Sequence, residues 1–167
     1  MGKQEEGEKM INKIKSIAKD VFNELGSGHT EAVYQKAMEV GLRLEKIPYE
    51  NQRIVPIFYK EHNVGQGIPD IIINECKNGK IIIELKAVSS KLSLKEEVQL
   101  KKYMEVLNIS KGVLINFPQP DSKKTPNEPE IIVIENKDEV KEYACYKCGR
   151  PIKHKGKCLN CNLKGKK

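Results

Sequence analysis

The sequence of 167 residues contains no run of about twenty apolar side chains, so we expect no helix that spans a membrane. Its first ten residues, MGKQEEGEKM, lack the apolar core of a signal peptide. Glu6 stands where a myristoylation motif has Ser or Thr. These absences predict an intracellular, cytoplasmic protein. The length of 167 residues fits one domain of ordinary size and a small appendage.

Excess positive charge is missing from most of the chain. Residues 1–140 hold 21 Lys and Arg against 22 Asp and Glu, whereas residues 141–167 hold 9 against 1. A compact cationic tail suggests an anionic polymer as partner, because neutralised phosphates release counterions and add affinity without sequence preference. A solvated tail that only raises solubility is the alternative.

The chain is organised around residues 68–86, which read IPDIIINECKNGKIIIELK. Two isoleucine-rich runs flank a turn signal at Asn78-Gly79 and predict a β-hairpin. Both faces of its strands are mostly apolar, so the strands should be central in a sheet with helices on both sides. One face would hold Ile71, Ile73, Ile81, Ile83 and Leu85, and the other Asp70, Ile72, Ile82, Glu84 and Lys86.

Three charged side chains at one end of this hairpin need partners if the sheet is buried. A five-residue loop would pair Asn74 with Lys80. Asp70 would then lie opposite Glu84, whereas a two-residue turn would place these acids on opposite faces. Two carboxylates with Lys86 nearby suit Mg²⁺ or Mn²⁺ and phosphodiester chemistry. A salt bridge at the strand end is the simpler alternative.

Apolar periodicity predicts two helices before the hairpin. The first runs from Met10 to Leu25 and ends at Gly26, where a C-cap glycine belongs. The second is capped by Thr30. Its predicted inward stripe consists of Val33, Ala37, Val40, Gly41 and Leu44.

Further elements are predicted on either side of the hairpin. Residues 53–59 should form a first strand at an edge or bulge. A capping box at 93–96 opens a third helix that runs to about Asn108. Residues 112–117 form a strand reached by a helical crossover, hence parallel, and 131–135 form one more. Buried candidates on the third helix are Leu94, Val98, Met104 and Leu107.

Two short motifs carry a family resemblance. Pro69-Asp70 is followed after thirteen residues by Glu84-Leu85-Lys86, and Gly28, Glu31 and Tyr34 fit the spacing GxxExxY. The chain resembles the GxxExxY family of the PD-(D/E)XK nuclease superfamily. Further agreement, in order over roughly residues 20–117, comes from Tyr59-Lys60, Gln99 with Tyr103, and GVLINF at 112–117.

The resemblance implies an α/β fold with a restriction-endonuclease-like core: a helix, a three-stranded meander, a helix and a strand, with a mixed sheet flanked by helices. It also implies that Asp70 and Glu84 bind Mg²⁺ or Mn²⁺, that Glu31 assists the metal or the water, and that Lys86 orients the nucleophile. Gln99 and Tyr103 would support the catalytic set. Taken alone, Glu31 could simply complement a helix dipole. Ile68-Pro69 departs from the polar approach to the first acid expected in this family.

Four cysteines in the basic tail have the spacing of a metal site. Each CxxC turn can present two thiolates to a tetrahedral Zn²⁺. The intracellular context disfavours disulfides, and a redox site would need only one CxxC pair. An iron–sulfur cluster could also use four cysteines and is the remaining alternative to zinc. About twenty residues with few apolar side chains cannot fold by burial, so zinc would be structural. The predicted ligands are Cys145, Cys148, Cys158 and Cys161.

These observations predict two parts, a nuclease-like domain over residues 1–140 and a basic zinc ribbon over 141–167. The leading hypothesis is a Mg²⁺-dependent nuclease that hydrolyses nucleic acid, with DNA as the expected substrate and a ribbon that binds nucleic acid. A non-catalytic nucleic-acid-binding or adaptor protein on an inactive nuclease fold is the alternative. A third hypothesis is a ribbon that binds protein, which salt-insensitive affinity would favour.

Overall fold

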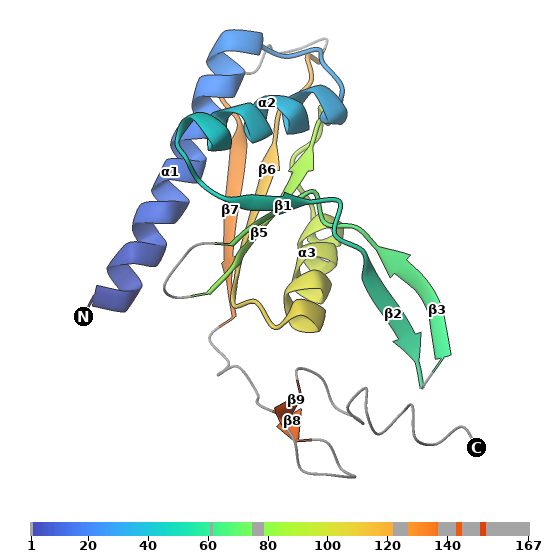
Figure 1. The fold of residues 1–167 in the computed structure, drawn as a ribbon. Coiled ribbons are helices and arrows are strands. Elements are labelled where there is room, and N and C mark those ends of the chain that lie inside the picture. Colours follow the sequence, from blue (N-terminus) through green and yellow to red (C-terminus); the bar gives the residue numbers. More distant parts are fainter. Residues whose placement is uncertain are drawn as a thin grey trace.

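The computed structural model describes residues 2–60, 62–74, 79–121, 127–136, 143–144 and 151–152. Its centre is a five-stranded sheet in the order β1-β4-β5-β6-β7. β5 and β6 run parallel, and the other neighbouring strands run antiparallel. The strands are β1 (Tyr49–Asn51), β4 (Ile71–Ile73), β5 (Ile81–Lys86), β6 (Lys111–Asn116) and β7 (Glu130–Glu135) (Figure 1).

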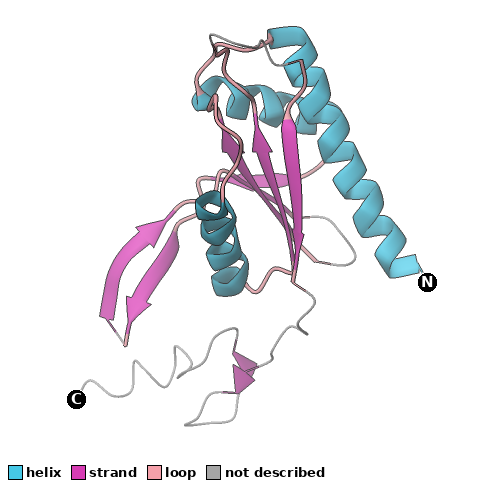
Figure 2. Ribbon diagram, turned by 180° about the vertical axis from the view of Figure 1, so that it is seen from behind, coloured by secondary structure: helices cyan, strands magenta, loops and turns pink. Residues whose placement is uncertain are grey.

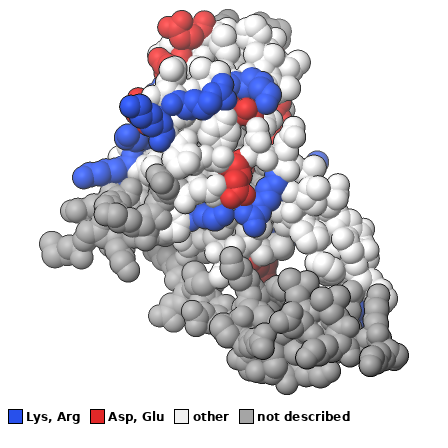
Figure 3. Space-filling model, viewed as in Figure 1, with Lys and Arg blue, Asp and Glu red and all other residues white. Residues whose placement is uncertain are grey.

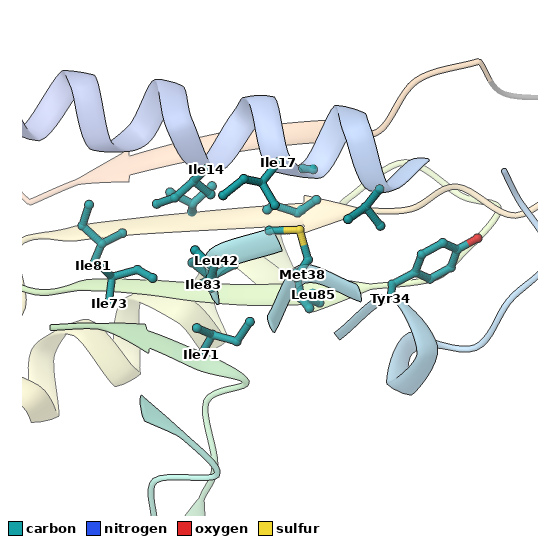
Figure 4. Packing of buried hydrophobic residues seen from close by; sticks show 14 of the residues in the cluster. Ile14, Ile17, Tyr34, Met38, Leu42, Ile71, Ile73, Ile81, Ile83 and Leu85 are labelled. Atoms are coloured by element: carbon teal, nitrogen blue, oxygen red, sulfur yellow. The ribbon is translucent and has the colours of Figure 1, made fainter. Parts of the chain in front are cut away.

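Helices cover both faces of this mixed sheet. α1 (Gly2–Leu25) and α2 (Glu31–Leu44) pack on one face, and α3 (Leu94–Leu107) packs on the other (Figure 2). Alternate isoleucines serve the two layers, because Ile72 and Ile82 belong to the α3 cluster. The opposite cluster, between the sheet and α1 and α2, includes Ile71, Ile73, Ile81, Ile83 and Leu85 (Figure 4).

The central hairpin has the register that brings its two acids together. β4 and β5 pair Ile71 with Ile83 and Ile73 with Ile81, which carries the same pairing on to Asp70 and Glu84. Both strands lie inside the sheet, as predicted. The longer loop is therefore confirmed over the shorter turn.

Most other predicted elements are confirmed. α1 ends at Leu25, and Gly26 follows with a φ of 67°. Ser93 and Glu96 form the capping box of α3. β6 is parallel to β5 and is reached through α3. Counting only strands of the main sheet, the predicted order of helix, three strands, helix and strand is present in α2, β1, β4, β5, α3 and β6, and helices flank this mixed sheet.

The predicted first strand is wrong in its location. The sheet begins instead with the short β1, which pairs with β4. Residues 53–59 contribute β2 (Val55–Tyr59), which pairs with β3 (His62–Gly67) in a separate two-stranded sheet. Of the described residues in β2 and β3, only Val55 is buried, so burial in the main sheet does not hold this hairpin.

The apolar stripes of two helices also differ from prediction. On α2, Tyr34, Met38 and Leu42 are buried at four-residue spacing. Ala37 and Gly41 do face the core, and a Cβ at Gly41 would meet Ile17 of α1. On α3, Leu100 and Met104 form the buried stripe and Leu107 is partly buried. The predicted stripe members that the structure leaves exposed are Val33, Val40 and Leu44 on α2, and Leu94 and Val98 on α3.

The C-terminal region is described only in part. β8 (Tyr143–Ala144) and β9 (Pro151–Ile152) pair antiparallel. Cys145, Cys148, Cys158 and Cys161 lie outside the described residues, so the zinc ribbon and the division at residue 140 stay predictions. Over the described ranges, the structure contains no helix with the length and apolarity needed to cross a membrane.

Candidate active site

Two acids meet where β4 begins and β5 ends. Asp70 directly precedes β4, and Glu84 lies in β5. The Leu85 backbone N–H donates a hydrogen bond of 2.7 Å to Asp70 Oδ2, which fixes the Asp70 carboxylate beside β5. Pairing between the strands therefore aligns the two carboxyl groups on the face of the sheet that α3 covers.

Glu84 is held in an environment that opposes its charge. Its side chain is 3% exposed, and its Oε1 atom is buried without a hydrogen-bond partner. Burial, and then the neighbouring charge of Asp70, raise the pKa of Glu84 to about 8. Burial also raises the pKa of Asp70, against the opposing hydrogen bond from Leu85. A cation bound beside the two carboxylates would lower both pKa values.

Lys86 and Glu31 complete the charged cluster from two further positions. Lys86 ends β5, and Glu31 begins α2. Their side chains form an ion pair, with 3.6 Å between Lys86 Nζ and Glu31 Oε2. Lys86 lowers the pKa of both Asp70 and Glu84, whereas Glu31 raises both. The charge of Glu31 therefore acts on the acidic pair as well as on the N-terminus of α2.

Tyr34 has a structural place next to this cluster. Its ring is fully buried and stacks on Phe117 at 4.4 Å between centroids. Its hydroxyl donates to the Gly26 carbonyl at 2.7 Å and accepts from the His29 N–H. These contacts tie the α1–α2 loop to the end of β6 and so fix the start of α2, where Glu31 lies.

Replacing Tyr34 with Phe tests that structural role. The variant keeps the stacked ring but leaves the Gly26 carbonyl without its donor, so we expect a loss of about 1 kcal/mol in the free energy of unfolding. Any phosphodiesterase activity should persist. Urea denaturation and a cleavage assay measure the two quantities, and an inactive variant with unchanged stability would place Tyr34 in the chemistry instead.

Sequence patterns alone missed a polar network on α2. Gln35 donates to the backbone carbonyl of Asp70 at 3.4 Å and to Glu39 Oε1 at 3.4 Å. Glu39, 3% exposed, also accepts from Asn51 of β1 at 3.2 Å and pairs with Lys36 at 3.1 Å. The network ties Asp70 to α2 and β1. Its signal in the sequence is the four-residue spacing from Glu31 through Gln35 to Glu39.

A second missed residue shapes the chain beyond Lys86. Asn116, at the end of β6, is 1% exposed. Its Oδ1 accepts from the Val88 N–H at 3.0 Å, and its amide group donates to the carbonyls of Val88 and Ser90. The Phe117 N–H donates to the Lys86 carbonyl at 2.8 Å. These bonds fix the end of β5 and hence the backbone of Lys86.

Gln99 and Tyr103 lie on α3, on the same face of the sheet as Glu84. Gln99 Nε2 donates to the Tyr103 hydroxyl at 3.4 Å. The Tyr103 ring lies so close to Gly67 of β3 that a Cβ there would be 2.4 Å from Cε1. Among the hydrogen bonds and ion pairs of the described residues, none joins either side chain to the four charged groups. Their supporting role stays a prediction.

The sequence model of the PD-(D/E)XK nuclease superfamily matches residues 8–128. The chain belongs to this superfamily. The match covers every strand of the sheet except β7, together with the three helices apart from the first residues of α1.

Two other comparisons add less than the superfamily match. No curated protein matches the chain. Among solved structures, the crystal structure of SSO0001 is similar to 65% of this chain at 19% identity, with a TM-score of 0.49. The chain spans 52% of the length of SSO0001.

PD-(D/E)XK nucleases typically use Mg²⁺ or Mn²⁺. Within the described part of the chain, no three Asp, Glu, His or Cys side chains are grouped so that they could hold a metal ion as they stand. Asp70 and Glu84 nevertheless fit such an ion, because a buried Glu84 oxygen has no partner and both pKa values are raised. Glu31 is engaged with Lys86 instead.

Proposed function

We propose that this protein is a metal-dependent nuclease that hydrolyses phosphodiester bonds, with DNA as substrate. The observation that carries the proposal is the buried pairing of Asp70 with Glu84 beside Lys86, in a chain of the PD-(D/E)XK nuclease superfamily. Structural salt bridges do not require two carboxylates at one buried position. Such an arrangement is destabilising unless a cation binds there.

Asp70 and Glu84 would hold Mg²⁺ or Mn²⁺ through hard oxygen ligands. Glu31 would join them as a third acid when it leaves Lys86. A divalent ion bound there supplies Lewis acidity toward the phosphate and a nucleophile at neutral pH. Glu31 would therefore have two states, one paired with Lys86 and one turned to the ion.

Lys86 would act on the reacting phosphate directly. Its ammonium group lies at the end of β5, and 20% of its side chain is exposed. Negative charge develops on the phosphate oxygens in the transition state, where a fixed cation is most effective in a partly dry site. The backbone bond between Phe117 and Lys86, and the loop bonds of Asn116, would keep this group in place.

The zinc ribbon completes the proposal as a second contact with the substrate. Its four cysteines would hold a structural Zn²⁺, and its lysines would bind phosphates without sequence preference. Nucleic-acid affinity that falls steeply with salt would support this role.

Incubation of labelled linear and circular DNA with the protein tests the function. We expect cleavage with Mg²⁺ or Mn²⁺ and none with EDTA. Lys86→Ala should reduce cleavage by about 10²-fold or more and leave DNA binding within about twofold. Metal-independent binding with no cleavage of either substrate would instead favour a non-catalytic binding protein.

A further inference from the structure

The hairpin of β2 and β3, residues 55–67, forms an arm that leaves the body of the protein. Figures 1 and 2 show it extending past α3, clear of α1 and α2. Phe58 and Tyr59 are 59% and 64% exposed, and Ile57 and Val64 are exposed too. Apolar and aromatic side chains gathered on an exposed element indicate a binding surface.

The base of the arm is fixed to the candidate active site. The Tyr103 ring of α3 occupies the space that a side chain at position 67 would need, so only Gly67 allows this close approach. From Gly67 the chain passes through Ile68 and the buried Pro69 to Asp70. Three residues span at most about 11 Å, so the arm starts within about 11 Å of Asp70.

Exposed aromatic rings beside an ammonium group, rather than a net charge of the arm, indicate which partner fits. Lys60 adopts a φ of 53° in the turn, and its ammonium group lies 5.5 Å from the centroid of the Tyr59 ring. In sequence, the arm carries one lysine and one acid, Glu61, which lies outside the described residues. Exposed aromatic rings next to an ammonium group match the bases and phosphates of a single strand, because a duplex hides the faces of its bases.

We infer that this arm binds unpaired nucleotides of the substrate, with Phe58 and Tyr59 stacking on bases and Lys60 contacting a phosphate. The inference rests on the proposed nuclease function, because that function makes nucleic acid the molecule that reaches the base of the arm. Five residues of strand extend the tip roughly 17 Å beyond Gly67. The tip thus lies within about 28 Å of Asp70, a distance that at most about eight nucleotides cover at the 3.4 Å rise of a fully stacked strand.

A tryptophan reporter tests the inference, because the sequence contains no tryptophan. Phe58→Trp places the sole indole at the tip. Without added Mg²⁺ or Mn²⁺, which keeps the substrate intact, a single-stranded oligonucleotide longer than the estimated reach should quench its fluorescence. A blunt duplex should leave it unchanged. The matched control is Leu44→Trp, on an exposed position of α2, and its emission should not respond to either.

Side-chain variants separate stacking from general apolar contact. The double variant Phe58→Leu with Tyr59→Leu should weaken single-strand affinity, measured by anisotropy, by at least about fivefold. The double variant Phe58→Tyr with Tyr59→Phe keeps two aromatic rings and should retain the affinity of the wild type. The salt dependence should be unchanged, since no charge is altered. Because binding is measured without metal, an inactive enzyme would leave these results intact. Two results would overturn the inference: indole emission of Phe58→Trp that the single strand does not quench, or unchanged single-strand affinity of the Leu pair. If sedimentation showed wild type as a dimer and the Leu pair as a monomer, the arm would instead be an interface between copies.

Discussion

Asp70→Asn and Glu84→Gln should each lower DNA cleavage by at least about 10³-fold while the protein stays folded. Each change removes one carboxylate from the pair that β4 and β5 align. An amide of the same shape keeps the packing but is a much weaker ligand for a hard cation. Initial rates at saturating Mg²⁺ and circular dichroism measure the two effects.

A matched control comes from another acid of the sheet. Glu50 of β1 pairs with Arg53 at 2.9 Å and with Lys80 at 3.2 Å, so its charge is already matched. Figure 3 shows acidic and basic side chains intermixed on one face of the molecule. Glu50→Gln should therefore leave cleavage within about twofold. Cleavage that survived in both Asp70→Asn and Glu84→Gln would remove these acids from the mechanism.

Without metal, the protein should lose stability as the pH rises from 5 to 8, and Glu84→Gln should abolish most of that loss. The pKa of Glu84 is raised from 4.5 to about 8 in the folded protein. Between these values the folded state binds a proton that the unfolded chain has released, so rising pH favours unfolding. Asp70, whose pKa is also raised, adds to the effect.

The size of this effect follows from the shift. The raised pKa of Glu84 corresponds to a loss of up to about 4 kcal/mol in the free energy of unfolding between pH 5 and pH 8. Urea denaturation in EDTA at these two pH values can resolve a loss of this size. Glu39→Gln is the control, because this equally buried glutamate has Lys36 and Asn51 as partners. Unlike Glu84→Gln, Glu39→Gln should not raise the free energy of unfolding at pH 8. Equal pH dependence of wild type and Glu84→Gln would contradict a strained carboxylate pair.

Sequence reasoning reached the hairpin and its acids because both depend on local patterns. The alternation of isoleucines assigns each residue to one face of the hairpin. The register then follows from the requirement that Asp70 and Glu84 lie on the same face. The capping box of α3 and Gly26 at the end of α1 are likewise local signals. Elements that depend on contacts between residues close together in the sequence could therefore be predicted.

The remaining features depend on contacts between distant parts of the chain. On α2, Val33 and Val40 form as good an apolar stripe as Tyr34 and Met38, and the stacking of Tyr34 on Phe117 decides between them. The role of Gln35 depends on a carbonyl 35 residues away. Residues 53–59 read as a sheet strand because periodicity does not distinguish a strand of the sheet from one arm of a protruding hairpin.

The acidic pair explains the site only if a divalent ion relieves its buried charge. Calorimetry of Mn²⁺ binding at pH 7, repeated in buffers with different ionisation enthalpies, counts the protons that leave the protein. Because the pKa of Glu84 is about 8, wild type should release close to one proton per ion bound, and Glu84→Gln should bind weakly and release almost none. Tight Mn²⁺ binding without proton release, unchanged by Glu84→Gln, would contradict the account.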